Sequence, residues 1–168
     1  DLAKALSSSV RRDLDGMLPC IVTKVSGDRQ RVSVLPIVKR KLDGGEYVSR
    51  AEVPNITVVS IGAGGLVMSW PISVGDKGWI EASDRDISLF LQSQIESDPN
   101  TGRNHSFSDS RFIPDVFTGF SVAAEDSGAV VIQSLDGSVK LSIDGSRVKI
   151  QNGNTSLVVN DGTVTGIA

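Results

Sequence analysis

The sequence predicts a mainly β protein of 168 residues, with a short N-terminal helix, a small closed barrel and a C-terminal β-helix shared between three chains. Three observations support this fold class. Short strand-like runs separated by turn residues fill residues 18–82, glycines recur at nearly even spacing in residues 127–168, and an apolar residue recurs every four positions at the N-terminus. We expect four segments: helix 1–16, barrel 17–92, collar 93–126 and shaft 127–168.

The C-terminal segment is a repeat. Its glycines are separated by eight or nine residues and lie at Gly128, Gly137, Gly145, Gly153 and Gly162. Apolar and polar residues alternate between them, as in a strand with one buried face. Each unit offers only two or three inward apolar residues, too few for a core within one chain. We therefore predict one strand of an intertwined, homotrimeric β-helix. The alternative is an ordinary β-meander, whose strands pair within one chain.

The alternation identifies the residues that would line the axis of the trimer. The predicted trimer core consists of Val130, Ile132, Val139, Leu141, Ile143, Val148, Ile150, Leu157, Val159 and Val164. The residues between them are predicted to face outward, namely Lys140, Ser142, Lys149 and Ser156. An aspartate in place of Leu141 should be costly, because three buried charges would meet near one axis.

Strand-like runs also dominate the region before the repeat. They cover residues 18–26, 31–42, 46–53, 55–61, 66–70 and 78–82, with turns rich in Gly and Asp between them. Short strands without long helices indicate a small barrel of the OB type. Residues 83–92 are predicted to form a short helix, with Ser83 as its N-cap and Asp86 in its first turn. Four phenylalanines within 93–126 suggest a collar rather than a disordered linker.

The N-terminal segment and the charge distribution suggest a docking surface. Leu2, Leu6, Val10 and Leu14 are spaced for one face of an amphipathic helix, which should dock on the barrel or on a neighbouring subunit. Residues 1–50 carry a net charge of +4 and residues 51–126 one of −7, which favours oriented docking. The candidate docking residues for a hub protein are Leu2, Leu6, Arg11, Arg12, Lys39, Arg40 and Lys41.

The residue types needed for catalysis are scarce. The only histidine is His105, and the only cysteine, Cys20, lies in a strand-like run and is expected to be a small buried hydrophobe. Asp84 and Asp86 are close in sequence but are better explained as charges at a helix start than as a glycosidase pair. We expect no enzymatic activity. Binding or degradation of glycans is one alternative function. Nucleic-acid binding by the barrel is a second, weakened by few aromatics, namely Tyr47, Trp70 and Trp79.

Several elements, in their order, resemble a known family. The opening run 18–22 with Val32, Val34 and Pro36 is followed by Gly64-Gly65, Pro71, Gly75-Asp76 and Asp84-Arg85-Asp86-Ile87. An element with Arg103, His105, Ser108 and Asp109 comes next, and the glycine-punctuated repeat closes the series. This order resembles short central spikes, the cell-puncturing proteins at the tip of contractile phage tails. The resemblance covers nearly all of the chain from Met17 onward.

The resemblance implies a homotrimer of OB barrels that continue into a triple-stranded β-helix. It implies a virion protein of the baseplate tip that plugs the tail tube, contacts a hub protein and punctures the host outer membrane when the sheath contracts. Spikes of this type often end in His-x-His pairs that hold an iron ion. This sequence has no such pair, so we expect no metal or other cofactor in these residues, and a separate tip protein is a possible partner. No transmembrane helix is expected either.

Overall fold

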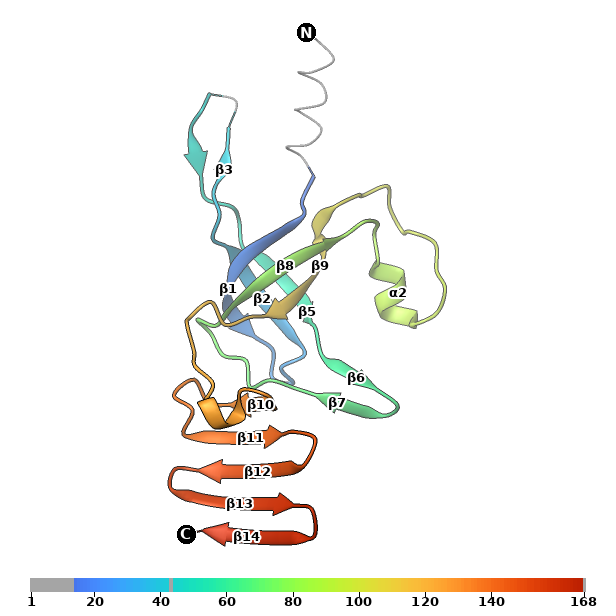
Figure 1. Cartoon of the computed structure of the whole chain (residues 1–168). Helices are drawn as coiled ribbons and strands as arrows, with labels where there is room; N and C mark the ends of the chain where they lie inside the picture. The colour runs from blue at the N-terminus through green and yellow to red at the C-terminus, as the bar shows by residue number, and fades with distance from the viewer. Residues whose placement is uncertain (1–13, 43, 168) are drawn as a thin grey trace. The chain divides into compact units, whose positions relative to one another are not determined.

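The computed structural model describes residues 14–42 and 44–167 (Figure 1). The chain divides into two units, residues 1–117 and 118–168, and each is described by itself. The predicted N-terminal helix lies outside the described residues, apart from Leu14 to Gly16. Within the described part of the chain, no helix is both long and apolar enough to cross a membrane.

The first unit is built on a closed five-stranded barrel with the order β1-β2-β5-β9-β8. The strands are β1 (Met17–Val25), β2 (Arg31–Pro36), β5 (Val53–Val58), β8 (Lys77–Ser83) and β9 (Ser106–Pro114). Every neighbouring pair is antiparallel except β5 and β9, which run parallel. Among these five strands the order around the barrel is first, second, third, fifth, fourth. The predicted barrel is therefore confirmed, and its strand order is that of a Greek-key barrel of the OB type.

The barrel closes around a small apolar core. Alternate residues of the strands point inward, and the buried apolar residues are Cys20, Val22, Val32, Val34, Ile56, Val58, Ile72, Ile80, Phe107 and Phe112. The ring of Phe112 occupies the space where a side chain of Gly78 would lie, since a Cβ built at Gly78 would be 2.5 Å from that ring and 2.3 Å from the carbonyl oxygen of Ile113. Glycine at this position lets β8 and β9 approach closely.

The segment 93–126, predicted as a collar, is not one element. Its residues Ser106–Pro114 form β9, which completes the barrel, and Phe107 and Phe112 belong to the barrel core. Local sequence patterns do not predict β9 as a barrel strand, because its partner β5 lies about fifty residues earlier in the chain. Phe117 packs against Trp79 with ring centroids 5.3 Å apart, whereas Phe120 is exposed in the second unit.

Two hairpins and one helix extend from the barrel. The hairpin of β3 (Arg40–Lys41) and β4 (Tyr47–Val48) follows β2, and the hairpin of β6 (Ile61–Ala63) and β7 (Leu66–Met68) follows β5. Helix α2 (Ser88–Ser93) follows β8 and is shorter than predicted. Ser83 ends β8 instead of capping the helix, and the Asp86 carboxylate accepts a hydrogen bond from the backbone N–H of Ser88 at 2.9 Å.

The second unit is an antiparallel sheet with a short 3-10 helix, η1 (Ala124–Asp126), before it. Its five strands are β10 (Val130–Gln133), β11 (Val139–Ile143), β12 (Arg147–Asn152), β13 (Thr155–Asn160) and β14 (Thr163–Ile167). Each strand pairs with the next one in sequence, as Figure 1 shows in orange and red. Within one chain the strands therefore form the β-meander that the sequence left as the alternative. Pairing between intertwined chains is not shown.

Candidate assembly surface

One face of the C-terminal sheet carries two apolar rows that cross its strands. The strand register places Val130, Ile143, Val148, Val159 and Val164 side by side, one from each strand. The second row consists of Ile132, Leu141, Ile150, Leu157 and Gly166. Side chains two positions apart on a strand share a face, so both rows and Val139 lie on the same side. This face holds all ten residues that the alternation selected as a core.

These residues are not covered within the chain. Nine of the ten are 38–70% exposed, and Leu141 is half-buried. The apolar surface ends at Val139. The residue opposite it on β12 is Asn152 and the next one across, on β13, is Thr155, and both are polar. A continuous exposed apolar face of this kind is typical of a protein interaction surface.

On the opposite face of the sheet, a charged cluster under η1 covers residues of β11 and β12. The Asp126 side chain is fully buried and accepts hydrogen bonds from the ammonium of Lys140, from the Ser142 hydroxyl at 2.8 Å and from the Arg147 guanidinium at 2.8 Å. The hydrogen bond from Lys140 is the main cause that holds the pKa of Asp126 below its ordinary value, and desolvation opposes it. The pKa of Lys140 is raised by the same contact.

Glu125 adds Lys149, a second residue of β12, to this cluster. Its carboxylate accepts hydrogen bonds from Lys149 at 2.7 Å and from Lys140 at 3.1 Å, and its backbone oxygen accepts one from Arg147 at 3.2 Å. Lys140 and Ser142 were predicted to face outward. They do point away from the apolar rows, but they are buried beneath η1 rather than solvated. Periodicity does not predict this cluster, since Glu125 and Asp126 precede the repeat.

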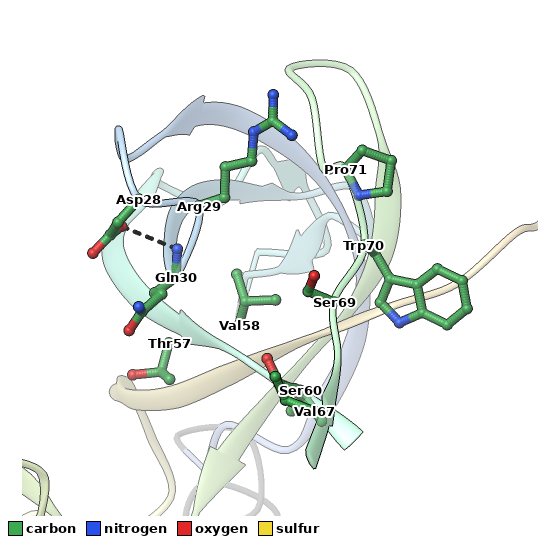
Figure 2. A pocket seen from close by; sticks show the side chains of 11 residues that line it. Asp28, Arg29, Gln30, Thr57, Val58, Ser60, Val67, Ser69, Trp70 and Pro71 are labelled. Carbon is green, nitrogen blue, oxygen red and sulfur yellow. Dashed lines mark hydrogen bonds between the residues drawn. The ribbon is translucent and has the colours of Figure 1, made fainter. Parts of the chain in front are cut away.

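A hollow of about 620 Å³ lies at the barrel between the β1–β2 turn and the segment after β7 (Figure 2). Asp28, Arg29 and Gln30 line one side, and Ser69, Trp70 and Pro71 line the other. Asp28 is the one carboxylate among the lining residues, and it already accepts hydrogen bonds from Ser26 and from the Gln30 backbone. In Figure 2 the indole of Trp70 points away from the hollow. This arrangement offers neither paired carboxylates nor a stacking platform.

The residues considered for catalysis all have structural contacts. His105 Nε2 lies 3.0 Å from the Asp84 carboxylate at the surface. Asp86 and Asp109 are buried and share Arg103, which contacts them at 3.1 and 3.0 Å. The hydrogen bond from Thr101 is the first cause that lowers the pKa of Asp86. Cys20 is buried in the barrel, and this burial raises its pKa to about 12. The described residues include no cluster of three or more His, Cys, Asp or Glu side chains that could hold a metal ion.

The predicted hub-docking residues are only partly described. Leu2, Leu6, Arg11 and Arg12 lie outside the described residues. Lys39, Arg40 and Lys41 are exposed on the hairpin of β3 and β4, where the ammonium of Lys41 lies 5.9 Å from the ring centroid of Tyr47. Exposed apolar residues flank these cations, among them Val38, Leu42 and Tyr47. The hairpin thus combines positive charge with apolar surface.

The first unit of the chain matches a known protein family. Residues 18–115, well over half of the chain, match the family described as phage protein Gp138 N-terminal domain. The chain belongs to this family. The matched Gp138 N-terminal domain covers the barrel, from its first strand to just beyond β9. No curated protein matches the chain. Membership in the Gp138 family makes this a phage protein and fits a structural role in a phage tail or baseplate.

Proposed function

We propose that this protein is the central spike of a contractile phage tail, a structural component of the virion at the tip of the baseplate. Three copies associate, and each turns the apolar face of its C-terminal sheet toward a common axis. The observation that carries the proposal is the pair of apolar rows, which run unbroken across the sheet except at Gly166 and are exposed in a single chain.

The energetics favour burial of this face. Transfer of one Val, Leu or Ile side chain out of water contributes about 1.5–3 kcal/mol, and ten such residues lie on each chain. On the opposite face, the cations Lys140, Arg147 and Lys149 are already paired with Glu125, Asp126 and Asp144. In the trimer, the apolar face of each sheet points toward the common axis and the charged face points outward.

Such a shaft is suited to puncturing the host outer membrane mechanically. Its strands are tied to neighbouring strands by backbone hydrogen bonds, and its apolar faces hold the three chains together, so that no single chain separates easily. Five strands spaced about 4.8 Å apart give a shaft on the order of 25 Å long. The barrels, which plug the tail tube, transmit the force of sheath contraction to it.

The docking contact to the baseplate hub is assigned to the N-terminal residues 1–12 and to the basic hairpin at Lys39, Arg40 and Lys41. Charge and apolar area lie together on this hairpin, a combination that gives both rapid encounter and stable contact. We propose no enzymatic activity and no cofactor for these residues. The described carboxylates of the barrel take part in structural hydrogen bonds and ion pairs, as Asp28, Asp86 and Asp109 illustrate.

The decisive experiment measures mass in solution by light scattering. A trimer of the 17.8 kDa chain is expected. The Leu141→Asp variant, measured at the same concentration, is expected to be a monomer. A monomeric wild-type protein would contradict the proposal. Glycan binding is tested in parallel, because a mechanical spike neither retains nor degrades host polysaccharide.

A further inference from the structure

A second hollow, of about 570 Å³, lies between helix α2 and the barrel strands β5, β8 and β9. Its apolar wall is formed by Val58, Val59, Ala82, Ile87, Phe90 and Leu91. Phe90 is 48% exposed although it belongs to this wall. We call this hollow the α2 groove. It offers an apolar surface on the first unit that is separate from the C-terminal sheet face.

The N-terminal segment joins the barrel at one end of this groove. The backbone N–H of Ala82, a residue of the groove wall, donates to the carbonyl oxygen of Gly16 at 3.0 Å. Asp15 is fixed beside it, because its backbone N–H donates to His105 and its carboxylate accepts hydrogen bonds from Phe107 and Arg50. The described part of the chain therefore begins beside a residue that lines the α2 groove.

The composition of residues 1–13 fits this groove. Leu2, Leu6 and Val10 are four positions apart, so one helical face would carry all three. A helix of this length spans about 20 Å. The segment carries three basic residues, Lys4, Arg11 and Arg12, against two acidic ones. Among the groove residues, Glu81 and Asp84 are acidic and Arg111 is basic. The groove therefore carries one net negative charge, against one net positive charge on the segment.

We infer that residues 1–13 bind in the α2 groove of their own chain, with Leu2, Leu6 and Val10 against Phe90 and Leu91. Attachment at Gly16 favours the chain's own groove, because a short tether gives a high effective concentration. Helical spacing places Arg12 opposite the apolar residues, where it stays available to a partner. This inference does not depend on the proposed trimer, since every groove residue lies in the first unit.

Disulfide trapping in the full chain tests the inference. The variant carries Leu6→Cys and Phe90→Cys, and its matched control carries Ser8→Cys and Phe90→Cys, because Ser8 lies opposite Leu6 on a helix. Two cysteines are joined only when their Cα atoms come within about 7 Å. Phe90 is half exposed, so its replacement is compatible with folding. Cys20 is buried with a raised pKa and stays unreactive under mild oxidation.

The expected result is an intramolecular disulfide in the Leu6 variant, seen as a faster-migrating single chain without reducing agent, and at least a tenfold lower yield in the Ser8 control. A crosslinked dimer or trimer would overturn the inference, since it would place the segment in the groove of a neighbouring copy. Equal yields for the two variants, or no crosslink at all, would overturn it too. The light-scattering mass is measured on the same samples and reports separately on the proposed assembly.

Discussion

The ammonium of Lys140 donates a hydrogen bond to the carboxylate of Asp126, and both side chains are almost entirely buried beneath η1. A buried ion pair contributes modestly compared with an apolar pair, but loss of one partner leaves the other charge without compensation. This relationship makes Asp126 the most sensitive polar residue of the C-terminal unit.

Replacement of Asp126 by Asn should destabilise the C-terminal unit by about 3–5 kcal/mol, because Lys140 and Arg147 lose their buried carboxylate partner and keep only the more exposed Glu125 and Asp144. Chemical denaturation followed by circular dichroism measures the loss. The control is Asp161→Asn, at an exposed turn residue between β13 and β14, which should cost about 0.5 kcal/mol or less. Equal stability of the two variants would contradict the role assigned to Asp126.

The same carboxylate should make stability fall in acid. Its pKa is lower in the folded chain than in the unfolded one, so its contribution is complete above the unfolded pKa, near 4, and disappears as pH falls through the folded value. Asp86, whose pKa is also lowered, acts with the same sign on the barrel. Unfolding at pH 7 and pH 3 should show a smaller pH dependence for Asp126→Asn than for the wild type. A parallel decrease in both proteins would speak against this assignment.

Leu141→Asp should abolish assembly, because it places a charge in the middle of the apolar face, in the same row as Ile132 and Ile150. Light scattering is expected to report a monomer. The matched control is Thr165→Asp on β14, since Thr165 pairs with Val158 and is exposed on the other face of the sheet. The control should keep the wild-type mass. Retention of the trimer by Leu141→Asp would show that this face is not the assembly surface.

Gly78→Ala should destabilise the barrel by about 1–3 kcal/mol, which is the usual cost of overpacking. The added Cβ would meet the Ile113 carbonyl oxygen and the Phe112 ring at distances that force β8 and β9 apart. Thermal unfolding measures the effect. Gly102→Ala serves as the control, because its Cβ would lie in open space and its backbone is not left-handed. A change of similar size in the two variants would mean that β8 and β9 tolerate the wider spacing.

Removal of residues 1–12 should weaken binding to the hub protein of the same phage tail, because it deletes the basic residues Arg11 and Arg12. Lys39→Glu combined with Lys41→Glu should weaken the same binding most at low salt, where electrostatic attraction is least screened. Surface plasmon resonance with the isolated hub protein measures both effects. Light scattering should still give a trimer for each variant. Unchanged hub affinity in both would place the docking surface elsewhere.

The sequence by itself determined which residues share a face in the C-terminal unit. Side chains alternate along any strand, so the ten apolar residues from Val130 to Val164 could be selected before their pairing was known. The short strands of the barrel followed from turn residues in the same way. Both signals are local, since they depend on the geometry of neighbouring residues alone.

Only the tertiary structure showed what lies far apart in sequence but close in space. It placed β9 beside β5 in parallel, although about fifty residues separate them, and thereby moved Phe107 and Phe112 from a predicted collar into the barrel core. It also brought Asp126 over Lys140 and Ser142, two residues whose alternation predicted solvent exposure. Periodicity tells which side of a sheet a residue faces, whereas burial depends on which distant segment covers that side.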